Sequence, residues 1–270
     1  STLDRASAAS DVYKRQDLNG KNALIFGVAN HRSIAWAIAK ELKESGANIA
    51  LAYQNERLKK HVNKLTENDT SITLTECDVT QEDQIENAIK EVTKKIGDID
   101  IIIHSIAFAP KEELSGNFSN TTRNGFLLSL EISAFSLIAI SKAAKPFMKK
   151  PGSSIITLSF QASEKVYPGY NVMGVAKSSL ENIVRQLAYE YGEEGIRVNT
   201  ISPGPLDTLA SRGISGFSNM KTIHENRAPL KRNVSTSEVA KVALFLASNM
   251  SSGITGSTIF VDGGYNIMGV

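Results

Sequence analysis

The sequence predicts an α/β fold in which a doubly wound parallel sheet carries helices on both faces. Two observations predict it: short, continuously apolar segments alternate with longer segments of helical periodicity, and Gly or Pro follows several of the apolar segments. Continuous apolar character is expected of strands that are buried on both faces. With 270 residues, 41% of them hydrophobic, the chain can form one core, and we expect a single domain over residues 17–270.

Composition narrows the classes of function. The chain carries 30 Lys and Arg against 28 Asp and Glu, scattered rather than grouped, so neither nucleic acid nor a membrane is predicted as a partner. Cys77 has no second cysteine to pair with, and a cytoplasmic location is expected. No uninterrupted apolar run reaches the ~18 residues of a membrane span, and no metal site is predicted. Residues 1–16 lack both Met and an apolar signal core, and we interpret them as a disordered or vector-derived tail.

The first predicted unit is a strand at residues 22–27, a loop, and a helix at residues 33–42. Gly27 stands where the strand ends, as in a dinucleotide-binding turn, although the loop lacks the three glycines of the GxGxxG fingerprint. Free amides at the start of the helix and the positive end of its dipole suit a pyrophosphate. Ser33 can cap the helix or touch that phosphate, and the sequence leaves both open.

A second strand is predicted at residues 46–53, directly before Gln54, the position where such folds read the adenine ribose. The usual Asp or Glu is absent there. Gln54 can hydrogen-bond a ribose hydroxyl, whereas Arg57 or Lys59 can meet a 2′-phosphate. At this point the choice between NADH and NADPH is open.

The third strand, at residues 71–79, ends in two residues with a possible role in binding the cofactor. Asp78 and Val79 can bracket an adenine with a carboxylate and an amide, and Asp78 can equally cap a helix. Cys77 is interpreted as an inert core thiol, because no basic neighbour stands out in the sequence.

The fourth strand belongs to the apolar segment 96–110, which closes with small residues and a proline. Ligands of open α/β sheets lie beyond the carboxyl ends of the strands, so residues 105–107 are predicted beside the cofactor, with Phe108 and Ala109 toward the substrate. His104 invites a catalytic role. A histidine in an apolar strand is more often a hydrogen-bonded core residue, and we interpret it in that way.

The second half of the chain continues the same alternation. A long helix is predicted at residues 126–145, and further strands at residues 153–160, 197–205 and 257–262. The fifth strand brings Ser159 and Phe160 to the same crevice. Residues 206–231 contain two glycines and are poorly periodic at their start, which predicts a substrate-binding lid.

The segment from residue 168 onward has the periodicity of a helix. On a helix, Tyr170, Met173 and Lys177 stand at positions i, i+3 and i+7 and share one face. A phenol that donates a hydrogen bond to a substrate oxygen, with an ammonium two turns away that holds a ribose, is an acid-catalysis pair. The alternative is an amphipathic helix with a solvated lysine.

Taken in order, these motifs resemble the short-chain dehydrogenase/reductase superfamily from about residue 18 to the C-terminus. The match rests on Gly27, Asp78, Ser105 and the segments 197–199, 202–205 and 261–264. Most members place the catalytic Tyr four residues before the Lys, where this chain has Met173. The seven-residue offset from Tyr170 to Lys177 resembles the bacterial enoyl-[acyl-carrier-protein] reductases, and the segments 27–35, 105–109 and 204–209 are similar to that branch too.

The resemblance implies a Rossmann-like fold, a homotetramer, and reduction of trans-2-enoyl thioesters on acyl carrier protein in fatty acid biosynthesis. Tyr170 would stabilise the enolate, and Lys177 would hold the ribose. The residues implied to hold the cofactor are Gly27, Ser33, Ile34, Gln54, Asp78, Val79, Ser105, Ile106, Ala107, Ile132, Lys177, Leu206 and Thr208. The acyl pocket would be lined by Ala107, Phe108, Ala109, Phe160, Tyr170, Met173, Ile214, Phe217 and Met220. Because Gln54 is neutral and no Arg follows it directly, NADH is expected over NADPH.

Two departures and two alternatives accompany this interpretation. Phe160 stands where the branch commonly has a second Tyr, and Asp207 stands where an Arg is frequent. One alternative is a ketoreductase or hydroxysteroid-type dehydrogenase that uses Ser159 and Tyr170 on a carbonyl, against which Met173 argues. The other is a catalytically silent nucleotide-binding module, which the presence of both Tyr170 and Lys177 disfavours.

Overall fold

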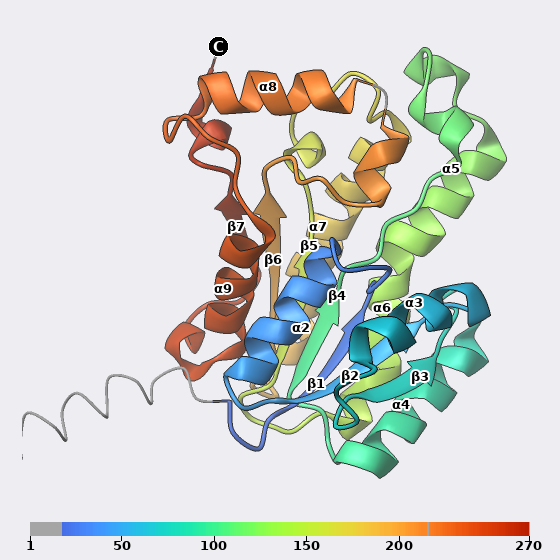
Figure 1. The fold of residues 1–270 in the computed structure, drawn as a ribbon, viewed down its shortest axis with the longest axis vertical. Helices are drawn as coiled ribbons and strands as arrows, with labels where there is room; N and C mark the ends of the chain where they lie inside the picture. Colours follow the sequence, from blue (N-terminus) through green and yellow to red (C-terminus); the bar gives the residue numbers. More distant parts are fainter. Residues whose placement is uncertain (1–17, 215, 270) are drawn as a thin grey trace, which may run out of the picture.

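The computed structural model describes residues 18–214 and 216–269, so the tail predicted at residues 1–16 lies outside it. Within the described residues, one parallel sheet of seven strands has the order β3-β2-β1-β4-β5-β6-β7 (Figure 1). The strands are β1 (Asn22–Phe26), β2 (Asn48–Tyr53), β3 (Thr73–Glu76), β4 (Ile101–His104), β5 (Ser154–Leu158), β6 (Arg197–Pro203) and β7 (Thr258–Val261). The predicted doubly wound parallel sheet is confirmed.

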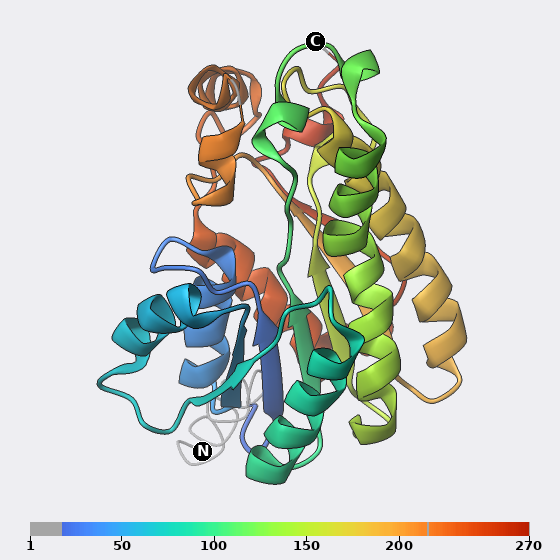
Figure 2. The same cartoon turned by 90° about the vertical axis from the view of Figure 1, so that its right-hand side faces the viewer.

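Helices cover both faces of this sheet, and the layers are clearest in Figure 2. One face carries α2 (Ile34–Glu44), α3 (Glu56–Thr66) and α9 (Thr236–Ala247). The other carries α4 (Glu82–Ile96), α5 (Arg123–Leu130), α6 (Ser136–Ala144) and α7 (Val172–Gly192). Helix α8 (Phe217–Arg227) crosses the carboxyl edge of the strands (Figure 1).

Two apolar cores, one on each side of the sheet, hold these layers together. On the first side, Ile38 and Leu42 of α2 pack with Val239 of α9 against β1 and β2. On the second, Ile89 of α4 and Leu180 of α7 pack against β1, β4 and β5. Strand β4 lies between the two cores, so its residues are buried on both faces. This is why its sequence is apolar throughout rather than alternating.

Most elements agree with the prediction, and the differences are local. Helices α4 and α9 lie outside the elements that the sequence analysis identified. The predicted helix at residues 126–145 begins earlier, at Arg123, and contains a π-helical turn at Glu131–Phe135. Tyr170 was predicted inside a helix but lies before α7, which begins at Val172. The intervening Asn171 has a φ of 40°, which breaks the helical path there.

The helical segment Arg123–Phe147 bears on the expectation that the chain has no membrane-spanning segment. Among the described residues it is the one helix long and apolar enough to cross a membrane, judged by length and composition only. Core helices of globular proteins meet the same criterion. In this fold the segment packs against α4 and α7, and Leu137 and Ile140 belong to the core beneath it.

The sheet reverses its winding between β1 and β4, which are neighbours although two strands separate them in sequence. Such a switch point opens a crevice at the carboxyl ends of the strands, where ligands of open α/β sheets bind. Gly27 follows β1 at this point with a φ of +98°. A Cβ atom on Gly27 would lie 2.0 Å from the carbonyl oxygen of Ser105, so the two loops meet too closely for any other residue.

Candidate active site

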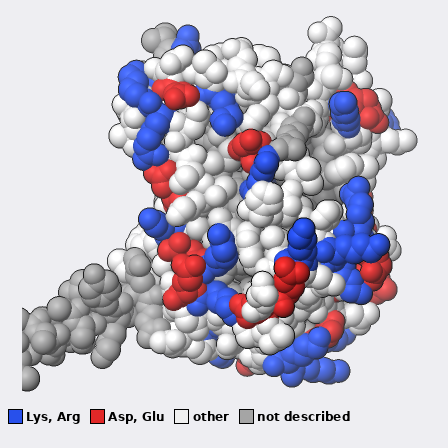
Figure 3. Space-filling model, in the orientation of Figure 1, with Lys and Arg blue, Asp and Glu red and all other residues white. Residues whose placement is uncertain are grey.

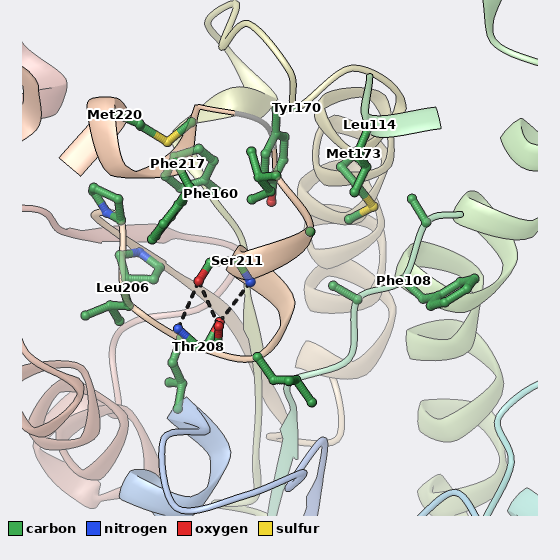
Figure 4. A pocket seen from close by; sticks show the side chains of 18 of the residues that line it. Phe108, Leu114, Phe160, Tyr170, Met173, Leu206, Thr208, Ser211, Phe217 and Met220 are labelled. Atoms are coloured by element: carbon green, nitrogen blue, oxygen red, sulfur yellow. Dashed lines mark hydrogen bonds between the residues drawn. The ribbon is translucent and has the colours of Figure 1, made fainter. Parts of the chain in front are cut away.

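A cavity of about 320 Å³ opens at the carboxyl edge of the sheet, lined in part by the segment that the sequence predicts as a lid (Figure 4). Its walls come from the loop after β4, the end of β5, the turn before α7, and the segment from β6 to α8. All nine residues predicted for the acyl pocket line it: Ala107, Phe108, Ala109, Phe160, Tyr170, Met173, Ile214, Phe217 and Met220. Four residues predicted for the cofactor, Ile34, Ala107, Leu206 and Thr208, line it too. The structure therefore places the two predicted sites side by side.

Aromatic and apolar side chains dominate this cavity. The ring of Phe160 lies 5.0 Å from that of Tyr170, centroid to centroid, at 47°. Met173 packs with Leu114 in a small apolar cluster that Tyr170 joins. Phe108 is 47% exposed, and its ring is turned away from Tyr170 (Figure 4). An elongated apolar ligand fits such walls better than a polar one.

Tyr170 presents a protonated phenol to this apolar space. Burial raises the pKa of the phenol above its ordinary value. The group is therefore neutral at physiological pH and can donate a hydrogen bond to an oxygen that gains negative charge.

Lys177 is a buried cation, so the alternative of a solvated lysine is wrong. Lys177 is 4% exposed, and its Nζ atom donates a hydrogen bond to the carbonyl oxygen of Leu158 at 2.7 Å. Burial lowers the pKa of the ammonium to about 8, and the carboxylate of Glu181 opposes that shift. A buried ammonium of this kind needs a functional reason.

The loop after β1 forms a turn that suits a phosphate group. Ser33 stands at the N-cap position of α2, but its hydroxyl bonds the loop rather than the helix. The Oγ atom accepts hydrogen bonds from the amides of Ala29 and Asn30, both at 3.0 Å. Side-chain capping by Ser33 is therefore not seen, and the helix start keeps amides for an anion.

The ends of β2 and β3 come together at the predicted adenosine site. Gln54 Nε2 donates to Asp78 Oδ2 at 3.1 Å. The amide and the hydroxyl of Thr80 donate to the other oxygen of Asp78. Although burial opposes them, these hydrogen bonds hold the pKa of Asp78 below its ordinary value, so it is an anion. Helix α4 has Gln81 at its N-cap, so Asp78 does not cap it.

Of the remaining predicted cofactor residues, three follow strand ends and one lies in a helix. Val79 comes after β3, and Ser105 and Ile106 come after β4, where Ser105 meets Gly27. Ile132 lies in the π-helical turn, and its carbonyl accepts a hydrogen bond from Ser136 Oγ at 2.6 Å. The close Gly27 turn, the open amides of α2 and the Lys177 ammonium together fit a dinucleotide.

The two residues interpreted as core groups are confirmed as such. His104 is fully buried, with Nδ1 2.8 Å from Thr157 Oγ1 and Nε2 2.8 Å from Ser136 Oγ. Burial lowers its pKa to about 3, so the ring is neutral. Burial likewise raises the pKa of Cys77 to about 12, so the thiol is protonated and inert.

Among the residues in and around the site that were not predicted, Leu114, Ser133 and Ser211 have defined contacts. Leu114 lines the cavity from a short 3-10 helix, Lys111–Leu114, within a largely polar stretch. Ser133 Oγ accepts from the Phe108 amide and donates to the Phe108 carbonyl, which fixes the loop after β4. Ser211 exchanges hydrogen bonds with Thr208 near the start of the segment predicted as a lid (Figure 4). Isolated serines and a single leucine carry no periodic signal that sequence analysis could detect.

A doubly wound sheet with a nucleotide turn at its switch point, a half-buried Tyr in an apolar cavity and a buried Lys near it defines a nicotinamide-dependent reductase of the short-chain type. The family model described as "Enoyl-(Acyl carrier protein) reductase" matches residues 27–266. The chain belongs to this family.

Relatives and solved structures agree with this assignment. The chain is 49% identical over 253 residues to "Enoyl-[acyl-carrier-protein] reductase [NADH] FabI" of Bacillus subtilis, covering 93% of this chain and 97% of the relative. It is 47% identical over 251 residues to the enzyme of the same name from Enterococcus faecalis, covering 93% and 99%. The Bacillus cereus enoyl-acyl carrier protein reductase, solved with NADP+ and indole naphthyridinone, superposes with a TM-score of 0.91 at 43% identity, covering 94% and 99%. The Anaplasma phagocytophilum enzyme, solved in complex with NAD, gives 0.89 at 42% identity, covering 94% and 96%.

Proposed function

We propose that this chain reduces the trans-2 double bond of enoyl thioesters on acyl carrier protein, with NADH as the hydride donor. Family membership supports the reaction class. The single observation that carries the site assignment is the presence of two groups near the crevice: the half-buried Tyr170 phenol, which is neutral, and the buried Lys177 ammonium, which is charged below about pH 8. Tyr170 lines an apolar cavity that can hold an acyl chain, and Lys177 Nζ is bonded to the carbonyl of Leu158, two residues before Phe160 in the cavity wall.

The two residues have separate tasks. When bound, the nicotinamide supplies a hydride to C3 of the enoyl group. Tyr170 donates a hydrogen bond to the thioester oxygen, which gains negative charge as C3 is reduced. Lys177 holds the ribose through its ammonium and so places the cofactor beside the acyl group. The apolar walls exclude water from the path between them.

Gln54 and Asp78 account for a preference for NADH. Gln54 is neutral and can bond a ribose hydroxyl, and the Asp78 carboxylate beside it is an anion that repels a 2′-phosphate. Lys59, a cation that could attract that phosphate, is paired with Glu56 at 2.6 Å. On the face drawn in Figure 3, Lys and Arg are interspersed with Asp and Glu. That mixture gives no single-sign field to favour the more highly charged cofactor.

The proposal extends to the organisation of the protein. Residues 17–270 form one domain, and residues 206–231 form a lid that closes over cofactor and substrate. A homotetramer is supported by exposed apolar side chains on the α5–α6 segment, where Leu127 is 57% and Phe135 is 47% exposed. Acyl carrier protein delivers the substrate, and a cytoplasmic location follows from that partnership.

The alternative of a ketoreductase loses its main support in the structure. That mechanism needs the Ser159 hydroxyl at the substrate carbonyl. Ser159 Oγ instead donates to Glu181 Oε1 at 2.5 Å, on the side of α7. Because this hydroxyl is bonded to Glu181, Tyr170 acts without a serine partner. Stabilisation of an enolate by Tyr170 needs no such partner, whereas reduction of a carbonyl in the alternative mechanism does.

The test is turnover of crotonyl and acetoacetyl thioesters with reduced nucleotide. We expect oxidation of NADH with the crotonyl substrate only. Tyr170→Phe removes one hydrogen bond to the developing enolate, so kcat should fall by up to ~10²–10³ while the NADH Kd stays unchanged. Turnover of acetoacetyl thioester, or full crotonyl turnover by Tyr170→Phe, would show that the assignment is wrong.

A further inference from the structure

Leu158 and Ser159, at the end of β5, form hydrogen bonds with two residues that lie one turn apart on α7. The carbonyl of Leu158 accepts a hydrogen bond from Lys177 Nζ at 2.7 Å. The hydroxyl of Ser159 donates to Glu181 Oε1 at 2.5 Å. Residues i and i+4 of a helix face the same side, so Lys177 and Glu181 lie on the side of α7 that faces β5.

This anion is buried, which calls for an explanation. Glu181 is 6% exposed and Ser159 is 5% exposed. A carboxylate at such a position is unfavourable unless it is hydrogen-bonded and paired with a cation, and an apolar side chain would pack there at lower cost. The ammonium of Lys177 interacts electrostatically with Glu181 from the same side of α7, and the Ser159 hydroxyl supplies the hydrogen bond.

Glu181 is also the negatively charged group that interacts electrostatically with Lys177. His104 on β4 faces the ammonium as well, but its ring is neutral because burial lowers its pKa to about 3. The Tyr170 phenol, ahead of α7, is protonated because burial raises its pKa. From β5, Lys177 meets the backbone carbonyl of Leu158. Among the titratable groups described around Lys177, Glu181 alone opposes the effect of burial.

We propose that Ser159 and Glu181 are positioning residues for the nucleotide site: Ser159 fixes the Glu181 carboxylate, and this carboxylate keeps the Lys177 ammonium charged and in place for the ribose. The proposal rests on the role assigned to Lys177 above. Without the carboxylate, the buried ammonium would release its proton at a lower pH, and the nucleotide would lose a charged hydrogen bond.

Glu181→Gln tests this directly, because the amide oxygen still accepts from Ser159 while the charge is removed. We would measure the NADH Kd by fluorescence from about pH 6 to 9.5, and the titration of the Lys177 side chain by NMR in nucleotide-free protein. In the wild type, affinity should decline as the pH rises through about 8. In Glu181→Gln this decline should lie about one pH unit lower, so that the Kd is weaker by about fivefold at pH 8 and about twofold at pH 7.

Controls separate this effect from a structural one. Glu190→Gln removes an exposed carboxylate from the same helix and should leave the pH profile unchanged. Ser159→Ala should shift the decline in the same direction but by less, and it decides the question if Glu181→Gln does not fold. A profile of either variant that coincides with the wild type, or lies at higher pH, overturns the proposal.

Lys177→Ala distinguishes failure of this inference from failure of the proposed function. If Lys177→Ala binds NADH as tightly as the wild type at pH 7, the role of Lys177 is itself wrong. If Lys177→Ala weakens binding at least several-fold while the Glu181→Gln profile overlays that of the wild type, only the role of Glu181 is wrong.

Discussion

Replacing Gly27 by Ala should damage both the stability of the fold and its nucleotide site. The added Cβ would lie 2.0 Å from the carbonyl oxygen and 2.6 Å from the carbonyl carbon of Ser105, so the loops after β1 and β4 must separate by about 1 Å. A non-glycine residue at a φ of +98° adds strain of about 1–3 kcal/mol, and overpacking adds about 1–3 kcal/mol. The sum is a loss of about 2–6 kcal/mol, which lowers the melting temperature by about 5–20 °C in a chain of this size.

The assay is thermal unfolding with and without NADH, and Gly20→Ala is the matched control. Gly20 also has a positive φ, +74°, but a Cβ there meets nothing within 4 Å. Gly20→Ala should therefore show only the backbone strain, about 1 kcal/mol. NADH affinity should fall by about tenfold or more in Gly27→Ala alone, because the moved loop faces the pyrophosphate. If the two variants have the same melting temperature and bind NADH equally, the close approach of the two loops is not the reason for glycine at position 27.

Two further predictions concern the nucleotide and the lid. The value of kcat/KM should be at least about tenfold higher with NADH than with NADPH. Gln54→Arg should reduce or reverse this preference, because it adds a cation for the 2′-phosphate. Equal values of kcat/KM for the two nucleotides in the wild type would contradict the assignment of Gln54. Amide hydrogen exchange in residues 206–220 should be faster than in β5 without ligand and slow down with nucleotide and substrate analogue, and full protection in the ligand-free protein would contradict the lid.

Much of the fold and of the cavity could be predicted because it depends on local pattern. Continuous apolar strands and the order of motifs identified the sheet, and the strand ends then placed Phe160 and the loop after β4 at the same edge. The position of Tyr170 could not be predicted, because the helical spacing continues through Asn171 while the backbone leaves the helix there. The contact between Ser159 and Glu181 joins residues 22 apart and depends on how α7 lies against β5, which no periodicity encodes.

The burial of Lys177 shows how the site trades stability for binding. Its pKa in the folded protein is about 8, against 10.5 for the free side chain, so the folded state favours the neutral amine. Below about pH 8 the protein holds a buried charge that destabilises it by about 3 kcal/mol. The sign follows from the direction of the shift: this destabilisation is complete below the folded pKa and disappears as the pH rises from about 8 toward 10.5. In the role proposed for Lys177, ribose binding needs the same ammonium and should be lost over that interval. Stability and nucleotide affinity therefore change in opposite directions above pH 8, and Glu181, by opposing the shift, extends the range in which the nucleotide binds.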